Sequence, residues 1–145
     1  MNLPSPSEGR IKMEENLVTL KIDDKEVKVK QGTTILQAAK QAGIDIPTLC
    51  FLKDINEVGD CRMCIVEVDG RKGFATSCIQ KAEEGMVVHT HSPAVMEARR
   101  VILDLILSNH HRDCLTCSRN GNCELQALAM KFNVQHVEFL SLIHI

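Results

Sequence analysis

The first regular pattern along the chain is an alternation of apolar and polar residues that begins at residue 17. It runs over residues 17–22 and returns over 27–29. A period of two places every second side chain on one face of a strand. Because a turn-forming Asp-Asp-Lys run at 23–25 separates the two stretches, they predict a β-hairpin. Residues 1–15 show no such period and contain Pro, Ser and charged residues, so we expect a disordered extension there.

A helix and further strands are predicted after the hairpin. Apolar residues recur at helical spacing over 35–42, with two threonines before them to cap the helix and Gly43 after them to end it. Strand-like stretches follow, two of them joined by an Asp-Gly turn; they cover residues 64–68, 71–76 and 86–90. A hairpin, a crossing helix and further strands together predict a β-grasp sheet over residues 16–91.

Helical spacing replaces alternation in the second half of the chain. The Ser-Pro pair at 92–93 offers a capping hydroxyl and a proline suited to the first helical position, and apolar residues then recur over 95–106 on one helix face. The polar stretch 112–122 has too few apolar residues to pack by itself, and a last helix is expected over 124–132. The pattern therefore predicts an α+β protein in which a small helical domain, residues 92–133, follows the sheet domain.

Charge and composition narrow the possible functions. The formal net charge is −2 and only 3% of the residues are aromatic, with no Trp and no Tyr. A nucleic-acid-binding surface needs a basic patch or aromatic stacking platforms, so we expect no nucleic-acid partner. The longest apolar run, residues 101–107, is interrupted by Asp104 and is far shorter than the roughly 20 residues that span a bilayer. No membrane span is therefore expected.

The cysteines give the strongest chemical signal. Seven cysteines and one histidine form two sets, C-x10-C-x2-C-x13-C and H-x3-C-x2-C-x5-C. The first set is Cys50, Cys61, Cys64 and Cys78, and the second is His110, Cys114, Cys117 and Cys123. An odd number of cysteines leaves one thiol over if the others form disulfides, whereas two four-ligand metal centres use all of them. Because the N-terminus has no apolar stretch typical of a secretory signal, we expect a reducing, cytoplasmic setting.

Iron–sulfur clusters and zinc both accept four ligands of this kind. A C-x2-C pair can hold a metal centre from one tight loop; structural zinc sites often combine two such pairs, whereas the first set has one. A cluster loop between a helix and a sheet is a ferredoxin arrangement, although the first gap here is longer than in plant-type ferredoxins. We therefore favour iron–sulfur clusters. A zinc-stapled structural adaptor and buried structural thiols are the alternatives.

The residues around both sets resemble one protein family. Ile-Pro-Thr-Leu-Cys at 46–50 and Gly-Asp-Cys-Arg-Met-Cys-Ile-Val-Glu-Val at 59–68 are similar to the [2Fe–2S] domain at the front of [FeFe]-hydrogenases and of the large peripheral iron–sulfur subunit of NADH:quinone oxidoreductase. The run from 110 to 126 is similar to a domain of the same proteins that holds a [4Fe–4S] cluster on one histidine and three cysteines. The resemblance implies a [2Fe–2S] cluster on the first set and a [4Fe–4S] cluster on the second. The H-x3-C spacing of the family selects His110 over His111.

The resemblance also implies an electron-transfer module with no catalytic residue of its own. Such a module would relay single electrons from a flavin- or NAD(P)H-oxidising subunit, or from a ferredoxin, toward further cluster domains and a catalytic domain of the parent protein. The run Cys-Leu-Thr-Cys-Ser-Arg-Asn-Gly-Asn-Cys at 114–123 looks more like the hydrogenases. An NAD(P)- or ferredoxin-linked [FeFe]-hydrogenase is therefore our first interpretation. A peripheral subunit of NADH:quinone oxidoreductase or of formate dehydrogenase is the alternative.

Both ends of the chain prompt expectations of their own. In the family the chain continues into further cluster domains, whereas residues 134–145 form a short tail. This tail ends in Leu-Ser-Leu-Ile-His-Ile, which looks like translated sequencing adapter. We expect a truncated gene fragment whose native sequence stops near Phe139. Met13 offers an alternative start.

Overall fold

The computed structural model describes residues 16–136 of the 145-residue chain. Its first elements are the predicted hairpin strands, β1 (Leu17–Ile22) and β2 (Lys25–Lys30), which pair antiparallel along their whole length. The two residues between them, Asp23 and Asp24, have φ angles of 45° and 70°. A two-residue hairpin turn needs this left-handed conformation to match the twist of its strands, and aspartate tolerates it.

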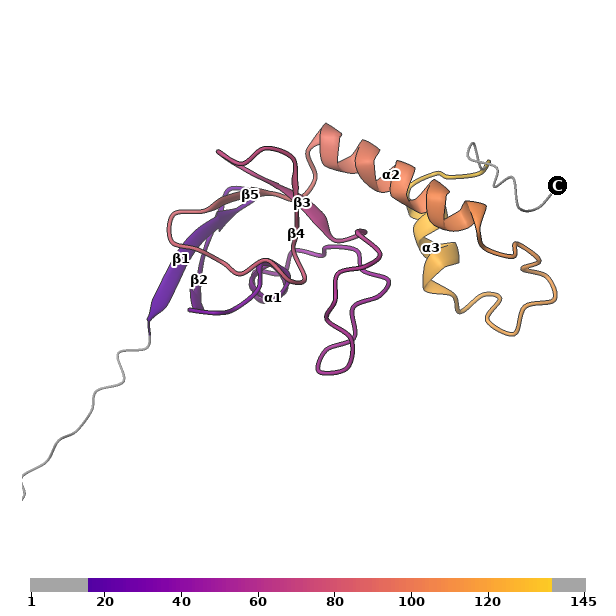
Figure 1. Cartoon of the computed structure of the whole chain (residues 1–145), viewed down its shortest axis with the longest axis horizontal. Coiled ribbons are helices and arrows are strands. Elements are labelled where there is room, and N and C mark those ends of the chain that lie inside the picture. Colours follow the sequence, from indigo (N-terminus) through magenta and orange to yellow (C-terminus); the bar gives the residue numbers. More distant parts are fainter. Residues whose placement is uncertain (1–15, 137–145) are drawn as a thin grey trace, which may run out of the picture.

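Five strands form one mixed sheet in the order β2-β1-β5-β3-β4. The three later strands are β3 (Ile65–Val68), β4 (Phe74–Thr76) and β5 (Val87–His89). Strand β5 runs parallel to β1 and antiparallel to β3, so it joins the N-terminal hairpin to the β3–β4 hairpin in the middle of the sheet. The sheet precedes two longer helical segments (Figure 1), which confirms the predicted α+β class.

Helix α1 (Ile35–Gln41) packs on the sheet and contributes to its core. A capping box starts the helix, because the Thr34 hydroxyl accepts the Gln37 N–H at 3.3 Å and the Gln37 side chain accepts the Thr34 N–H at 3.3 Å. Buried residues of the helix and of four strands form one core, which includes Leu20, Ile22, Val29, Ile35, Val66 and Val88. Cys64 and Cys78 belong to the same core. Part of the first cysteine set is therefore fixed by the packing of the sheet.

Two helices form the second half of the described chain. Helices α2 (Pro93–Ser108) and α3 (Glu124–Lys131) lie beyond the sheet, and a long loop without helix or strand joins them (Figure 1). Ser92 caps α2, because its hydroxyl accepts the Val95 N–H at 3.3 Å. The same hydroxyl donates to a carboxylate oxygen of Glu67 at 2.7 Å. Ser92 therefore both starts the helix and fixes it to β3.

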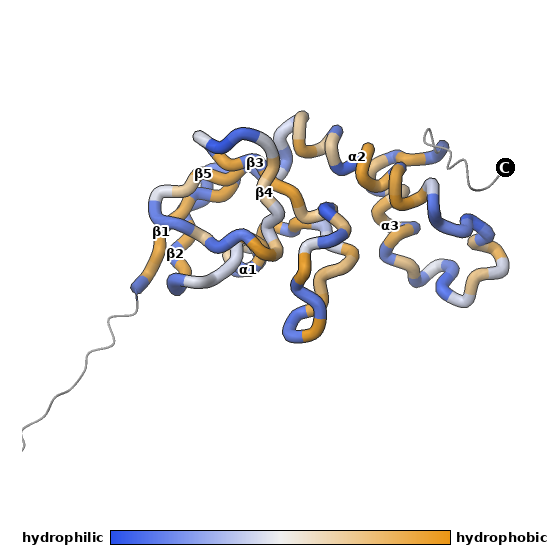
Figure 2. Tube along the Cα trace, viewed as in Figure 1, coloured by the Kyte–Doolittle hydropathy of each residue, from blue (hydrophilic) through white to orange (hydrophobic). Residues whose placement is uncertain are grey.

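A second, smaller core joins the two halves. Its most buried members are Met63 from the loop before β3, Leu103 from α2 and Phe132 after α3. Partly buried residues pack around them: Leu49, Cys61, Met96, Ile102, Ile106, Leu107, Leu125, Leu128, Ala129 and Val134. The predicted apolar face of α2 is thus a packing face. The loop between α2 and α3, in contrast, is mostly hydrophilic (Figure 2).

The predicted domain boundary and the expected absence of a membrane span can be compared with the structure. The predicted domain boundary after residue 91 falls in the short segment between β5 and α2. Within residues 16–136, no helix is both long enough and apolar enough to cross a membrane. The expected N-terminal extension, the alternative start at Met13 and the expected end of native sequence near Phe139 lie outside the described residues.

Candidate metal centres

The first cysteine set lies on loops that lead into and out of the sheet. Cys50 and Cys61 stand at the two ends of one loop and are half-buried. Cys64 directly precedes β3 and Cys78 follows β4, and each is only 1% exposed. Because β3 and β4 are antiparallel neighbours, the start of one strand lies beside the end of the other. The hairpin therefore brings the two buried cysteines together.

Hydrogen bonds fix the backbone around these cysteines. Ser77 donates to the carbonyl oxygen of Cys64 twice, through its hydroxyl at 2.6 Å and its N–H at 3.2 Å. The N–H of Cys61 donates to the sulfur of Cys50 at 3.4 Å. Hydrogen bonds to sulfur tune an iron–sulfur cluster, so a backbone N–H directed at a cysteine sulfur fits a cluster ligand.

Burial and the three neighbouring thiols of the first set raise the pKa of Cys78. The pKa of Cys78 is raised to about 12, first by burial and then by a hydrogen bond with Cys64 and by the charges of Cys64, Cys50 and Cys61. A thiol in this position stays protonated at neutral pH until a metal displaces its proton.

Within residues 16–136, no three His, Cys, Asp or Glu side chains surround one metal-ion position. This result is compatible with a [2Fe–2S] cluster, because the four ligands of such a cluster are divided between two irons and do not surround a single ion.

Gly59 allows the first cysteine loop to pack closely. Its φ angle is +70°, and an added Cβ would lie 3.2 Å from Cγ2 of Thr76 and 3.3 Å from Cδ1 of Ile79. The left-handed conformation and the close approach both favour glycine. The loop is therefore held against the segment that carries Cys78.

The second set lies on the loop between α2 and α3. Residues 109–122 are all exposed, and Cys123 is half-buried at the start of α3. His110, Cys114 and Cys123 line one pocket of about 420 Å³, together with apolar residues of α2, of α3 and of the segment after α3. Cys117 is not among the residues that line it. Three of the four predicted ligands are thus brought to one cavity.

Local hydrogen bonds shape this second loop. The N–H of Cys117 donates to the carbonyl oxygen of Cys114 at 3.2 Å, and the sulfur of Cys117 accepts the N–H of Arg119 at 3.4 Å. The side chain of Gln126 on α3 accepts the N–H of Gly121 at 3.1 Å. The end of the loop is therefore anchored to the beginning of α3.

The structure distinguishes the two adjacent histidines. His110 lines the pocket. Its backbone N–H donates to the carbonyl oxygen of Leu107 at 3.2 Å, which extends the end of α2. His111 does not line that pocket. Cys123 is the N-cap residue of α3, yet its side chain makes no capping hydrogen bond. The sulfur of Cys123 is therefore not used to cap α3 and remains available as a metal ligand.

Residues 15–93 match the family described as a 2Fe-2S iron-sulfur cluster binding domain. The chain belongs to this 2Fe-2S family. Residues 99–138 match a second family, described as the NADH-ubiquinone oxidoreductase-G iron-sulfur binding region. The two matches confirm the prediction of one [2Fe–2S] and one [4Fe–4S] cluster, in that order along the chain.

Relatives of this 2Fe-2S family member are oxidoreductase subunits. The chain is 46% identical over 125 residues to the NADP-reducing hydrogenase subunit HndD of Solidesulfovibrio fructosivorans, a match that covers 83% of this chain and 21% of that subunit. It is 38% identical over 123 residues to the NADH-ubiquinone oxidoreductase 75 kDa subunit of Reclinomonas americana, covering 85% of this chain and 18% of the relative. The chain therefore spans about a fifth of the hydrogenase subunit and a slightly smaller share of the other.

A solved structure is similar as well. An NAD+-reducing [NiFe]-hydrogenase in its H2-reduced state matches with a TM-score of 0.79 and 32% sequence identity, over 86% of this chain and 53% of that one. The predicted resemblance to hydrogenases and to NADH:quinone oxidoreductase is thus confirmed. The chain is an iron–sulfur electron-transfer module of the kind that these proteins contain.

In this 2Fe-2S family member, the second core reaches both candidate sites. Cys61 of the first set packs against it. Leu107, Leu125, Ala129 and Val134 also pack in it, and the same four residues line the pocket of the second set. An apolar cluster therefore connects the two candidate sites.

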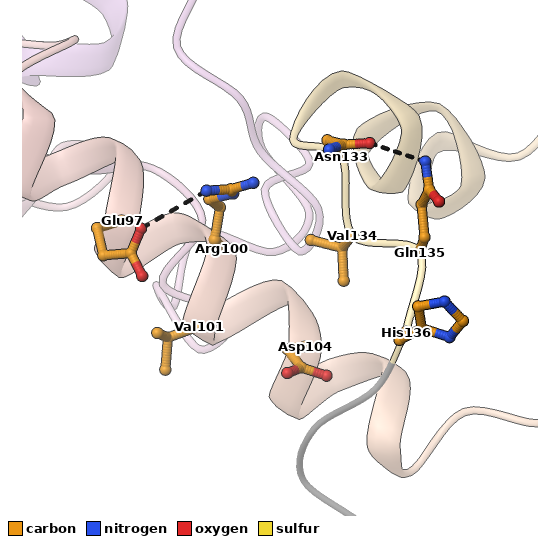
Figure 3. Close-up of a pocket in the computed structure, with 8 residues that line it drawn as sticks. All are labelled: Glu97, Arg100, Val101, Asp104, Asn133, Val134, Gln135 and His136. Carbon is orange, nitrogen blue, oxygen red and sulfur yellow. Dashed lines mark hydrogen bonds and ion pairs between the residues drawn. The ribbon is translucent and has the colours of Figure 1, made fainter.

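Another pocket, of about 350 Å³, contains none of the predicted ligands. It lies between α2 and residues 133–136, and Figure 3 shows Glu97 paired with Arg100 on one side and Asn133 bonded to Gln135 on the other. Cluster ligation needs thiolate or imidazole groups at convergent positions. The candidate metal sites of this chain are therefore identified by the positions of their ligands, and the presence of a pocket alone does not indicate such a site.

Arg99 is a functional candidate that lies outside both predicted ligand sets. It lies on α2 with 0% exposure, and its Nη2 donates at 2.7 Å to the carbonyl oxygen of Ile65, the residue after Cys64. The buried residues of α2 include Val95 and Leu103, four positions before and after it. An arginine in the middle of an apolar helix face was the signal that could have revealed it.

Proposed function

We propose that the two clusters are bound by the two ligand sets: the [2Fe–2S] cluster by Cys50, Cys61, Cys64 and Cys78, and the [4Fe–4S] cluster by His110, Cys114, Cys117 and Cys123. The convergence of the first four thiols is the observation that carries the proposal: Cys64 and Cys78 are buried together at the ends of one hairpin, Cys61 donates its N–H to the sulfur of Cys50 at 3.4 Å, and the other three thiols all raise the pKa of Cys78. The pocket shared by His110, Cys114 and Cys123 supports the second assignment. When bound, such clusters accept and release single electrons.

The residues of the chain would hold the clusters, shield one of them and separate the two by an apolar layer. The burial of Cys64 and Cys78 limits the access of water to the first site, and solvent exposure is one of the factors that set a cluster's reduction potential. Electrons would cross the apolar layer around Met63, Leu103 and Phe132, which packs between the two sites. The sequence contains no Tyr or Trp, so an aromatic relay through either residue type is not part of the proposed path.

For the parent protein, we propose the front part of an NAD(P)- or ferredoxin-linked [FeFe]-hydrogenase. The 46% identity with a NADP-reducing hydrogenase subunit supports a hydrogenase. The run from Cys114 to Cys123, which resembles [FeFe]-hydrogenases, favours that type. Because a [NiFe]-hydrogenase contains a similar module, the sequence downstream of the module distinguishes the two types. A subunit of NADH:quinone oxidoreductase is the second candidate, favoured by the match of residues 99–138.

The proposed partners follow from this assignment. An NAD(P)H- or flavin-oxidising subunit, or a ferredoxin, would supply or receive electrons at one end. Further cluster domains and a catalytic domain would exchange them at the other. We also propose a cytoplasmic location, because the seven cysteines are free thiols in the structure and a reducing compartment preserves thiols as metal ligands.

Electron paramagnetic resonance of the reduced, anaerobically reconstituted chain tests the ligand assignment. We expect two distinct signals in the wild type. Cys64→Ser should abolish the [2Fe–2S] signal and leave the [4Fe–4S] signal, and Cys114→Ser should do the reverse. Each variant thus contains its own control, since the unmodified site reports that the chain has folded. Loss of both signals, or of the wrong one, in a folded variant would contradict the assignment.

The zinc alternative gives a different result in the same preparation. A zinc-stapled adaptor would be colourless and would contain zinc in place of iron. Cluster-loaded protein absorbs visible light, and because the chain has no Trp or Tyr, almost no aromatic absorbance overlaps the near-ultraviolet bands. A colourless protein that resists reconstitution with iron and sulfide but takes up zinc would exclude electron transfer.

A further inference from the structure

Arg99 is a buried cation with two unused donor groups. Its side chain is fully buried between the sheet and α2, and its Nη2 donates to the carbonyl oxygen of Ile65 at 2.7 Å. The other two nitrogens, Nε and Nη1, are buried and have no hydrogen-bond partner among residues 16–136. Most buried polar groups in proteins are hydrogen-bonded, so two unpaired nitrogens on one guanidinium call for an explanation.

The carboxylates that influence Arg99 are engaged with other groups. Asp23 accepts the N–H of Thr90 at 2.7 Å and also its hydroxyl. Asp45 pairs with a lysine of α3 at 3.4 Å. Burial lowers the pKa of Arg99 to about 10, and the charges of Cys64, Asp23 and Asp45 oppose this change. The guanidinium is therefore still a cation at neutral pH, and no bonded carboxylate among the described residues neutralises it.

The position of this cation relative to the first site suggests what neutralises it. Ile65, which accepts its hydrogen bond, follows Cys64 directly. Among the charges that oppose the lowering of its pKa, that of Cys64 is the largest. An unpaired buried charge is strongly destabilising, whereas a cluster on four thiolates is an anion that gains one more negative charge on reduction. Arg99 would find its counter-charge in the cluster-loaded protein.

We propose that the guanidinium of Arg99 compensates the charge of the [2Fe–2S] site and raises its reduction potential. The inference rests on the proposed function, and specifically on the ligation of that cluster by Cys64. Since Arg99 belongs to α2, the helical half of the chain sets the potential of the cluster in the sheet half. Electron entry at one site therefore depends on the docking of the other half.

Redox titration of the reconstituted 145-residue chain, followed by the [2Fe–2S] resonance, tests the proposal. Arg99→Met removes the charge and keeps an apolar side chain of similar length, a replacement that buried ionic sites often tolerate. The matched control is Arg100→Met, which removes the charge of the next residue of α2, a side chain that is 47% exposed. Arg99→Lys keeps the charge but loses the forked geometry that reaches Ile65.

We expect Arg99→Met to lower the midpoint potential of the [2Fe–2S] cluster. The expected change is roughly tenfold in the equilibrium constant for reduction, which is about 59 mV for a one-electron couple. The control should shift the midpoint by less than half as much, and the [4Fe–4S] midpoint should move less than that of [2Fe–2S]. Arg99→Lys should stay close to the wild type.

Several results would overturn the inference. If Arg99→Met takes up the cluster and its [2Fe–2S] midpoint equals that of the wild type, Arg99 only fastens α2 to β3. An equal shift of both clusters would likewise exclude a local effect. If Arg99→Met does not take up the cluster, Arg99→Lys separates the two roles. A purely structural role predicts that Arg99→Lys also loses the cluster, whereas a charge role predicts that Arg99→Lys keeps it. Absence of any [2Fe–2S] signal in the wild type is a separate result, and it would reject the proposed function before any variant is compared.

Discussion

The two candidate metal centres differ in how much of each is supported by the rest of the fold. In the first, Cys64 and Cys78 are members of the sheet core, and Ser77 ties their backbones together with two hydrogen bonds. In the second, residues 109–122 are all exposed, and their loop contains neither helix nor strand. The first site is shaped largely by the sheet, whereas the second depends on short-range hydrogen bonds and on the ends of two helices.

This difference has a physical consequence for cluster binding. A metal centre whose ligands lie on an otherwise unsupported loop contributes its binding energy directly to the folding of that loop. A centre whose ligands are already packed adds less order when it binds. We therefore expect the cluster to organise the second site, and the fold to organise the first.

Amide hydrogen exchange should show the greatest difference between the two candidate sites. On cluster loading, we expect exchange in residues 110–122 to slow on the order of 1,000-fold, because the loop has little other support. Exchange in residues 64–78 should slow far less, since the sheet protects that segment in both forms. Mass-spectrometric exchange of the apoprotein and the reconstituted protein measures both segments at once. Equal protection gained by both segments would contradict the contrast.

The next effect concerns the core that joins the two sites. Met63→Ala should lower the free energy of unfolding by about 3 kcal/mol, because it removes a fully buried side chain that packs with Leu103 and Phe132. Met130→Ala is the matched control: that methionine is 74% exposed, and its loss should change stability by less than about 0.5 kcal/mol. Denaturant unfolding of the two variants makes the comparison. Similar values for both would mean that the halves are not held together by this core.

A third prediction sharpens the contrast between the ligand sets. His110→Cys should keep the second cluster but lower its midpoint potential by roughly 100 mV, because a thiolate adds a negative charge that a neutral imidazole does not. His111→Cys should leave the midpoint unchanged, since that side chain does not line the pocket. Redox titration of the [4Fe–4S] resonance decides. A midpoint that is unchanged or higher in His110→Cys would count against His110 as a ligand.

The smallest expected effect tests how tightly the first loop packs. Gly59 and Gly73 both have left-handed φ angles, +70° and +81°, but an added Cβ meets Thr76 and Ile79 only at Gly59. Gly59→Ala should therefore be more destabilising than Gly73→Ala by about 1 kcal/mol. Thermal unfolding of the two apoproteins provides the comparison. Equal losses of stability would show that Thr76 and Ile79 can move to accommodate a methyl group at residue 59.

Much of the fold could be predicted from residue patterns, because local signals were strong. The alternation around Asp23 and Asp24 predicted the hairpin, and the Ser-Pro pair at 92–93 predicted the start of α2. The β4 prediction, residues 71–76, was too long: the strand covers Phe74–Thr76. Gly73 is left-handed, and the N–H of Arg71 donates to the carbonyl oxygen of Val68 at 3.1 Å in the turn, so the strand begins after these residues. Local patterns also carry no record of which distant strands pair, so the parallel contact of β1 with β5 could not be read from them.

The candidate sites could be predicted in chemistry but not in environment. The spacing of the cysteines indicates two four-ligand centres, and the resemblance assigns the cluster types and selects His110 over His111. Spacing does not show burial, so the contrast between buried Cys78 and exposed Cys117 comes only from the structure. The position of Arg99 behind Cys64 likewise depends on how α2 docks on β3, which is a long-range contact.

In the proposed function, eight side chains hold two sulfide-bridged iron clusters. Its most direct test is the iron and acid-labile sulfide content of the anaerobically reconstituted chain, with Cys64→Ser and Cys114→Ser alongside. We expect the wild type to contain the iron and sulfide of one [2Fe–2S] plus one [4Fe–4S] cluster, and each variant to lose the content of its own cluster alone. Protein that contains metal but no acid-labile sulfide would show that the eight side chains hold no iron–sulfur cluster.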